Sequence, residues 1–241
     1  MATPRLKKKL DQTDHDDVYY PDVYYPIEDD EPLAESEYQF FPLTYAHAAL
    51  RSWFADDPTT WVGADMFIYY EEGVPQSSVA PDVFVVTQTH NRHLRNIFQT
   101  WVEGRVPELV LEIISRTSVY RDTVRKYELY KRLGVREYWL YDPTVEGVLE
   151  PRLRGYALVG GEYRPIEVRE VDGRCVGESE VLGLELHAEF GWFRFFDPVS
   201  GEYLPDNQEN QLRRVEAEAR AEAAEARQAE LEAEIRLLRG Q

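Results

Sequence analysis

Three charged side chains in this sequence stand where they could hold a metal ion against a phosphodiester. Glu112 is the one charge inside the apolar run 109–114, and such a run favours a strand covered on both faces. A buried carboxylate without a partner is very costly, so Glu112 must face an opening, pair with a base or bind a metal. Asp82 begins a second strand-like run, 82–86, and Lys126 follows on a predicted helix. Two carboxylates and a lysine are a set that can bind a divalent cation beside a scissile phosphate.

The two acids would meet only if their strands are neighbours and both side chains point to the same face. Side chains alternate along a strand, so the side chain of Glu112 points to the same face as those of residues 110 and 114. The backbone carbonyl of Ile113 could add a third oxygen, and oxygen is the ligand atom that Mg²⁺ and Mn²⁺ prefer in proteins.

Lys126 could complete this group from its helix. It lies four residues from both Asp122 and Tyr130, so it shares a helix face with them. A lysine near a metal can orient the attacking water and stabilise developing negative charge. On spacing alone the simpler interpretation is favoured, in which Asp82 begins a strand, Glu112 pairs with an arginine and Lys126 is solvated.

Two other polar features give weaker signals. His90 and His93 have a spacing found in metal sites, but no cysteine or acid lies close by in sequence, so we expect a loop pair. Asp65 falls within a strand predicted over 61–70, where it could face the same cleft as the two acids or lie at a strand edge.

Composition bounds the class of protein. The chain has 241 residues and a mass of 28.2 kDa, and 43% of its residues are hydrophobic, which is enough for one domain with a core. No apolar stretch reaches the ~18 residues of a membrane span, and no apolar segment follows the basic start as in a secretory signal. Cys175 is the only cysteine, which excludes an intrachain disulfide and disfavours a cysteine-based zinc site. We expect a cytoplasmic protein.

The net charge of −18 argues at first against a nucleic-acid partner, but the charge is unevenly distributed. Residues 11–37 carry eleven acidic side chains and no Lys or Arg, whereas residues 116–136 carry seven basic side chains against two acidic ones. The segment that follows Glu112 is therefore locally basic. A solvated helix face would also explain it, but its position next to Glu112 favours contacts with nucleic acid.

The sequence divides into three parts. Residues 1–36 are acidic and poor in aliphatic side chains, so we predict a disordered tail; it contains the tandem repeat Asp-Val-Tyr-Tyr-Pro, whose tyrosines could stack on a partner or fold back on the domain. Residues 37–206 form the predicted folded domain. Residues 207–241 are rich in Ala, Glu and Arg and predict a long helix.

Within the domain, periodicity and turn residues predict the elements. We expect Ser115 and Ser118 to cap the second helix and a polar linker to occupy 87–106. The predicted elements are a helix over 45–54 with Thr44 as N-cap, strands over 61–70, 82–86, 108–115 and 136–141, a helix over 117–133, a hairpin over 154–168 and further short strands over 181–204.

The C-terminal helix carries two weak apolar registers. Leu231, Ile235 and Leu238 fit one, and Leu212 and Val215 with Ala219 fit the other. A short coiled coil, a lone amphipathic helix and a solvated helical tail are all compatible with this pattern.

Four blocks in order, 79–86, 109–115, 125–130 and 134–143, resemble the Uma2 family. This is a group of bacterial restriction-endonuclease-like proteins within the PD-(D/E)XK nuclease superfamily, and the resemblance covers about residues 38–205. It implies an α/β (α+β) fold: a mixed sheet flanked by helices, here with extra C-terminal strands and a long C-terminal helix.

The resemblance also implies roles for particular residues. Pro81 and Asp82 match the family's PD element, and Glu112 matches its second acid. Many nucleases of the superfamily carry the lysine two residues after that acid, where this chain has Ile114, and the resemblance suggests that Lys126 takes its place from the following helix. Arg116 departs from the family, which commonly has Pro there.

The resemblance predicts a DNA endonuclease that uses Mg²⁺ or Mn²⁺. Asp82, Glu112 and the Ile113 carbonyl would hold the metal, and Lys126 would position the water and stabilise charge. We expect three arginines to contact phosphates. A homodimer is also compatible with this activity, because cutting both strands of a duplex favours two active sites. These arginines are Arg116, Arg121 and Arg125.

Two alternatives stay open on sequence. One is a catalytically inactive nucleic-acid-binding or assembly module that uses the same fold as a scaffold, because a fold does not imply a function. The other is an interaction protein that acts through its acidic tyrosine-containing tail.

Overall fold

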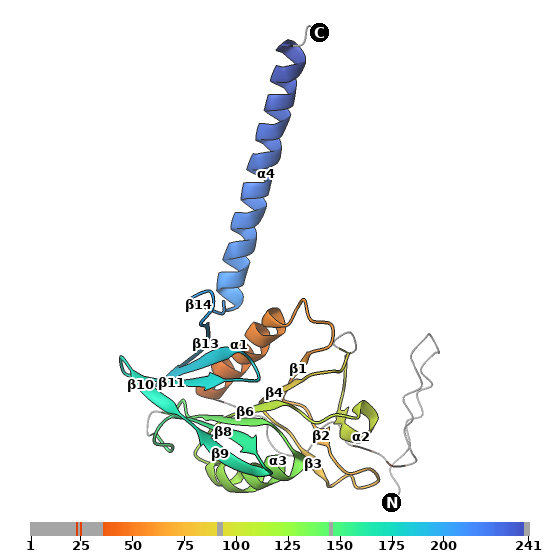
Figure 1. Cartoon of the computed structure of the whole chain (residues 1–241), viewed down its shortest axis with the longest axis vertical. Coiled ribbons are helices and arrows are strands. Elements are labelled where there is room, and N and C mark those ends of the chain that lie inside the picture. Colours follow the sequence, from red (N-terminus) through yellow and green to blue (C-terminus); the bar gives the residue numbers. More distant parts are fainter. Residues whose placement is uncertain (1–22, 24, 26–35, 91–93, 145–146, 239–241) are drawn as a thin grey trace, which may run out of the picture.

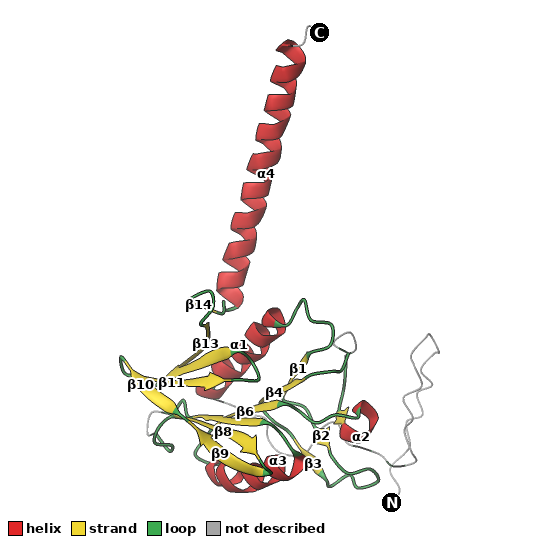
Figure 2. Ribbon diagram, in the orientation of Figure 1, coloured by secondary structure: helices red, strands yellow, loops and turns green. Residues whose placement is uncertain are grey.

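The fold of the described residues is mixed α+β, as the sequence predicts. The computed structural model describes residues 23, 25, 36–90, 94–144 and 147–238. Three sheets, a π-helical turn and four α-helices make up these residues (Figures 1 and 2).

The main sheet has six strands in the order β1-β4-β6-β7-β8-β9. The pair β6–β7 is parallel and the other neighbours are antiparallel. A parallel pair needs a crossover connection, and the segment that contains η1 and α3 supplies it. The strands are β1 (Trp61–Ala64), β4 (Val83–Val86), β6 (Leu109–Ile113), β7 (Glu137–Tyr141), β8 (Leu153–Val159) and β9 (Glu162–Ile166).

Two layers cover the central strands β4, β6 and β7, whose residues are all buried. On one face, α1 (Glu37–Trp53) and a five-stranded sheet pack against the main sheet around Leu111 and Trp139. On the other face, α3 (Tyr127–Leu133) packs around Val110 and Tyr138. Figure 1 shows α1 and α3 on opposite sides of the sheet. This two-sided burial is why these strands are continuous apolar runs in the sequence.

The remaining elements extend the domain. The five-stranded sheet is antiparallel and has the order β10-β11-β12-β13-β14, and a small sheet has the order β3-β2-β5. Their strands and the other helices are β2 (Ile68–Tyr69), β3 (Ser78–Val79), β5 (Phe98–Gln99), α2 (Thr100–Glu103), η1 (Arg121–Lys126), β10 (Val168–Val171), β11 (Arg174–Ser179), β12 (Leu184–Glu189), β13 (Trp192–Asp197), β14 (Glu202–Tyr203) and α4 (Asn207–Leu238).

The first helix begins earlier than the sequence predicts. Its N-cap is Ser36, and Thr44 lies inside the helix, where its hydroxyl donates to the carbonyl of Phe40 at 2.8 Å. Such back-bonding is an alternative use of a threonine that the sequence favours as a cap. The helix also contains Pro42, whose buried ring packs on the domain.

The predicted strand over 61–70 is two short strands in different sheets. β1 ends at Ala64, and Asp65 adopts a left-handed conformation with φ of 45° before β2 begins at Ile68. Asp65 is exposed and outside either strand. Its N–H lies 3.1 Å from the carbonyls of both Pro81 and Asp82, so its backbone holds the entry to β4.

Two further predictions need correction. The expected polar linker over 87–106 contains β5 and α2. The expected α-helix over 117–133 contains the π-helical turn η1 before α3. Ser115 and Ser118 stabilise the turn before this segment, because the hydroxyl of each accepts the N–H of the other at about 3 Å, but η1 has no side-chain cap hydrogen bond. Strand β7, the β8–β9 hairpin and the long α4 agree with the predictions.

Most of the predicted tail over 1–36 lies outside the described residues, but Tyr25 is described and packs on the domain. Its ring lies 4.9 Å from that of Tyr69 and 5.5 Å from that of Trp101, and its hydroxyl accepts the N–H of Gly73 at 2.7 Å. The second tyrosine pair of the tandem repeat therefore contributes one buried side chain to the domain.

Among the described helices, none combines the length and apolarity needed to cross a membrane.

Candidate active site

The site lies where β4 begins and β6 ends. In the pairing of β4 with β6, Val83 lies opposite Leu111. Continuing this register by one residue places Asp82 opposite Glu112. Alternation puts both side chains on the face that α3 covers, because Phe84 and Val110 belong to the core on that side. The backbone N–H of Ile113 donates to Oδ2 of Asp82 at 2.5 Å, which fixes that carboxylate beside the end of β6. The two acids of the sequence motif are therefore brought together.

Lys126 reaches the same point from the helical layer. Its Nζ lies 2.7 Å from Oε2 of Glu112, 3.4 Å from Oδ1 of Asp122 and 3.1 Å from the carbonyl of Ala80. Both Lys126 and Glu112 are buried, with 7% and 1% of their surfaces exposed. The lysine ammonium therefore lies between two carboxylates and the strand entry, as the family resemblance suggests, and it is not the solvated lysine that spacing alone favours.

Two residues of the site were not assigned a role from the sequence. Tyr130 donates its hydroxyl to Oε1 of Glu112 at 2.7 Å, and Asp122 supplies the second carboxylate beside Lys126. Tyr138 donates to the carbonyl of Asp122 at 2.8 Å and so holds that turn on the sheet. The signal that could have found Asp122 and Tyr130 was their spacing of four residues on either side of Lys126.

The electrostatics of the site set the burial of the Glu112 carboxyl against its ion pair with Lys126. Burial raises the pKa of Glu112 to about 8, because the charged form loses its hydration, and the negative charges of Asp82 and Asp122 add to the rise. The ammonium of Lys126 offsets part of this effect. Burial also raises the pKa of Tyr130 well above its usual value, so its hydroxyl remains a donor at neutral pH. A positive charge placed among these carboxylates would relieve their repulsion.

The donor atoms suit a hard divalent cation. Oδ1 of Asp122 is a buried oxygen without a hydrogen bond, although Lys126 lies 3.4 Å away. The N–H and C=O of one strand residue point to the same side of the strand. The Ile113 N–H donates to Asp82, so the Ile113 carbonyl also faces β4. The residue opposite it there is Pro81, which has no N–H to donate to this carbonyl. No cluster of three or more metal-binding His, Cys, Asp or Glu side chains occurs in the described residues. Two carboxylates with a backbone carbonyl match Mg²⁺, which keeps several water ligands.

The three predicted phosphate-contacting arginines are exposed. They lie on the segment whose buried side carries Asp122 and Lys126, so they belong to the outer surface of that segment. Arg125 lies over the ring of Tyr120 at 5.7 Å, and Arg121 lies 3.7 Å from Asp122. Of the histidine pair, His93 lies outside the described residues.

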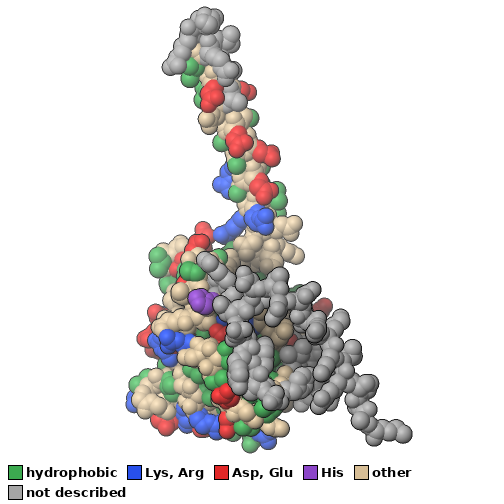
Figure 3. Space-filling view, turned by 90° about the vertical axis from the view of Figure 1, so that its right-hand side faces the viewer, with side chains coloured by type: hydrophobic (Ala, Val, Ile, Leu, Met, Phe, Trp, Pro, Cys, Tyr) green, Lys and Arg blue, Asp and Glu red, His purple; other side chains and the backbone are tan. Residues whose placement is uncertain are grey.

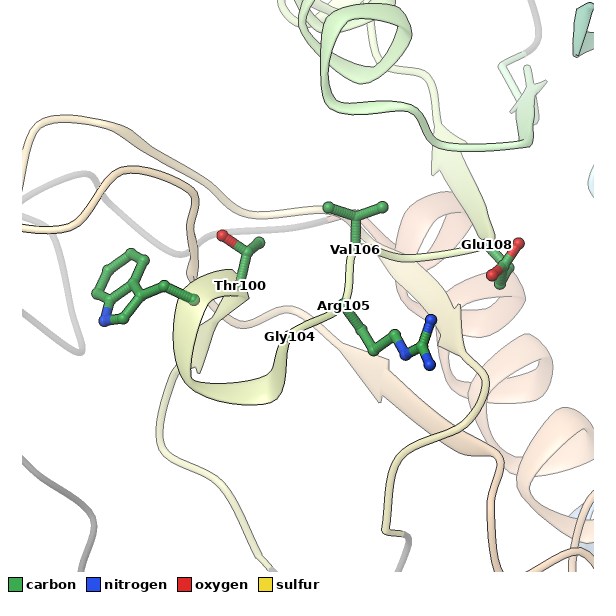
Figure 4. Close-up of a pocket in the computed structure, with 6 residues that line it drawn as sticks. Thr100, Gly104, Arg105, Val106 and Glu108 are labelled. Atoms are coloured by element: carbon green, nitrogen blue, oxygen red, sulfur yellow. The ribbon is translucent and has the colours of Figure 1, made fainter.

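A surface depression of about 490 Å³ lies apart from this site. Figure 4 shows its lining from α2 and the loop that follows, with Arg105 and Glu108 among the side chains. Glu108 precedes β6 and Glu112 is near the end of that strand, so roughly 13 Å of strand separates them. The depression takes no part in the arrangement of the acids.

Comparison with known proteins places the chain in a family. The Uma2 family, described as "Putative restriction endonuclease", matches residues 42–189. This chain belongs to the Uma2 family. The matched range contains Asp82, Glu112 and Lys126, and it ends before α4.

The comparison with solved structures also gives matches. One of them is described as a "putative nuclease belonging to DUF820" from Anabaena variabilis ATCC 29413. The identity is 13%, the TM-score is 0.45, and the match covers 63% of this chain and 76% of the other. No curated protein matches this chain.

Proposed function

We propose that this member of the Uma2 family is a metal-dependent endonuclease that hydrolyses phosphodiester bonds in DNA. The observation that carries the proposal is the buried contact of Lys126 with Glu112, beside Asp82 at the end of two adjacent strands. Burying an ion pair gains little stability, and apolar side chains could fill the same space in the core. Stability alone therefore does not explain why a lysine and two acids are held together here.

Asp82, Glu112 and the Ile113 carbonyl would hold Mg²⁺ or Mn²⁺. When bound, the cation neutralises charge on the phosphate and activates a water molecule. Lys126 stabilises the negative charge that develops on the phosphate oxygens and orients the attacking water. Tyr130 and Asp122 position the Glu112 carboxylate and the Lys126 ammonium.

The exposed arginines would bind the duplex. Arg116, Arg121 and Arg125 lie on the outer surface of the segment that carries Lys126. Guanidinium groups bind phosphate with fixed, often bidentate geometry. Their position would hold the DNA backbone over the acids while contributing no sequence specificity.

The test is cleavage of supercoiled DNA with Mg²⁺ or Mn²⁺. We expect metal-dependent nicking by the wild type and its loss in Glu112→Gln and Lys126→Met. Matched controls are Glu128→Gln and Lys131→Met, because these residues form an ion pair of 3.0 Å on the surface of α3. Thermal unfolding of all variants would show that the chains remain folded.

One observation favours a second candidate, a non-catalytic nucleic-acid-binding module. Both oxygens of Glu112 already accept hydrogen bonds, from Tyr130 and Lys126, so the pair could be purely structural. In that case no nicking occurs with either metal, and DNA binding is unchanged in Glu112→Gln. Retained nicking in Glu112→Gln would instead place the chemistry elsewhere.

A further inference from the structure

Helix α4 (Asn207–Leu238) extends away from the domain (Figure 1). Beyond its base, no other described element packs against it. It is attached at its base, where Arg194 donates to Glu209 at 2.6 Å and Arg213 lies 3.4 Å from Glu202. Every described side chain from residue 211 onward is exposed. A helix of this length extends about 48 Å at 1.5 Å per residue, and helices in proteins gain most of their stability by packing.

A seven-residue repeat runs along the outer part of the helix. With Leu231 and Ile235 as core positions, the alternating spacing of three and four residues places small or apolar residues and one glutamine on the same stripe from residue 217 outward. In heptad notation, a is Ala221, Gln228 and Ile235, d is Ala217, Ala224 and Leu231, and the a position before this stripe is Arg214. Leu231 and Ile235 are 49% and 46% exposed, which is a cost for a helix that remains alone. The stripe is the seam of a coiled coil.

The charges that flank the stripe have one sign on each side. From residue 213 to 232 every g position is arginine and every e position is glutamate. In Figure 3 basic, acidic and apolar side chains are interspersed along α4. The g residues are Arg213, Arg220 and Arg227, and the e residues are Glu218, Glu225 and Glu232.

This separation of charge selects the partner and its direction. In a parallel pair of identical helices, each g residue meets the e residue five positions later on the other chain. Arg213 then meets Glu218, Arg220 meets Glu225 and Arg227 meets Glu232, and two-fold symmetry repeats each contact. An antiparallel pair brings g to g and e to e, which sets arginine against arginine and glutamate against glutamate over this range.

The second apolar register does not give a comparable dimer. With Leu212 and Val215 as core positions, the next d position is Glu222. That register also pairs Glu225 with Glu230 across the interface. Leu212 and Val215 therefore lie on the outer side of the coil near its base, and the register through Leu231 is the one that the charges support.

We propose that α4 forms a parallel two-stranded coiled coil with a second copy of this chain. Gln228 lies at a core position, where a polar side chain fixes register and strand number. The alanines at the base allow the helices to approach closely, and the leucine and isoleucine bury the larger apolar surface farther out. Both folded domains lie at the same end of the rod. The proposal stands whether or not the domain is a nuclease.

The test is the mass of the full chain in solution, measured by light scattering at micromolar concentration. We expect twice the 28.2 kDa of one chain. Glu218→Arg, Glu225→Arg and Glu232→Arg together set arginine against arginine, and we expect a monomer. The matched control reverses Glu216, Glu222 and Glu230, which lie on the outer side of the same coil, and should remain a dimer.

Complementary variants test the pairing itself. Arg213→Glu, Arg220→Glu and Arg227→Glu also give a monomer, and mixing these chains with the glutamate-reversed chains restores a dimer. Ala217→Cys in a Cys175→Ser background forms a disulfide between parallel helices, while Val215→Cys does not. A monomeric wild type, a larger assembly, or a dimer that survives the first reversal overturns the proposal. Crosslinking of residue 217 only to residues near 228 shows the antiparallel arrangement and overturns it as well.

Discussion

Glu112 is the residue on which the proposed metal site depends, because only its deprotonated carboxylate would hold a cation. Its carboxyl is buried, contacts Lys126 and Tyr130, and lies on the same sheet face as Asp82. Burial outweighs the ammonium of Lys126 and raises the pKa of Glu112 to about 8. Metal ions bind the deprotonated carboxylate, so protons and cation compete at this side chain.

The raised pKa predicts a stability that falls as pH rises in the absence of metal. The folded pKa of about 8 lies above the ordinary 4.5, so the contribution of Glu112 is full below 4.5 and is lost as pH rises through 8. The loss accumulates between these two pH values, at no more than about 1.36 kcal/mol per pH unit. The free energy of unfolding, measured by urea denaturation in the presence of a chelator from pH 5 to about 8.5, checks this prediction. The control is Glu112→Gln, whose stability should not show this decline.

Metal should reverse this trend. In the proposed function Mn²⁺ binds the Glu112 carboxylate, so the Mn²⁺ affinity should rise about tenfold per pH unit below 8 and level off above it. Calorimetric titration at several pH values measures the affinity without any assay of activity. Glu128→Gln, which changes an exposed carboxyl on α3, should leave the pH dependence intact. An affinity independent of pH in the wild type would contradict the assignment of Glu112 as a ligand.

At the scale of elements, the side chain of Trp139 fills much of the contact between the main sheet and the five-stranded sheet. Trp139 on β7 extends between the main sheet and the five-stranded sheet, and added Cβ atoms at Gly155 and Gly177 would lie 2.5 and 2.8 Å from its ring. Glu137 accepts the indole N–H at 2.9 Å and the N–H of Val181 at 3.0 Å. The absence of side chains at these two glycines is what leaves space for the indole.

We therefore predict that Gly155→Ala destabilises the domain by about 1–3 kcal/mol, the usual cost of overpacking a core. The effect should shrink in the double variant with Trp139→Phe, because the smaller ring vacates the space that the methyl group needs. Chemical denaturation of the four chains of the cycle gives the coupling between the two sites. Additive losses would show that the strain at Gly155 arises from its backbone and not from the indole.

The elements that the sequence predicts best are those buried on both faces. The runs that became β4, β6 and β7 are continuous and apolar, and burial is the physical reason. Side chains alternate between the two faces of a strand. The positions of Asp82 and Glu112 within their runs therefore place both side chains on the same face of the sheet, provided that the two strands are neighbours. The approach of Lys126 was suggested by the family resemblance, whereas its spacing alone favoured a solvated lysine.

Other elements carried no comparable signal. β10 is exposed along most of its length and β5 has two residues, so tertiary pairing, not pattern, makes them strands. The π-helical turn η1 widens the helix where Asp122 and Lys126 lie, and no local residue preference marks it. The hydrogen bond of Tyr130 to Glu112 depends on the packing of α3 against β6, which a single sequence does not specify.

At the scale of the whole molecule, the charge is divided between an acidic start and a basic segment beside the site. Residues 11–35 hold ten carboxylates, which are more than half of the net charge of −18. The basic segment carries the exposed Arg116, Arg121 and Arg125. A polyanion such as DNA is repelled by the first and attracted by the second, and salt screens both over about 10 Å at 0.1 M.

Replacing those ten carboxylates with amides changes the net charge from −18 to −8 while keeping the chain length and Tyr25. We expect DNA association to become about tenfold faster at low salt, because electrostatic steering acts on the encounter rate. Stopped-flow binding across a salt series checks this, and the gain should vanish at high salt. Tyr25→Ala, which removes the contact with Tyr69 and Trp101 without changing charge, separates steering from docking. A gain that persists at high salt, or that Tyr25→Ala reproduces, would show that the acidic segment acts by occupying the domain surface and not through its charge.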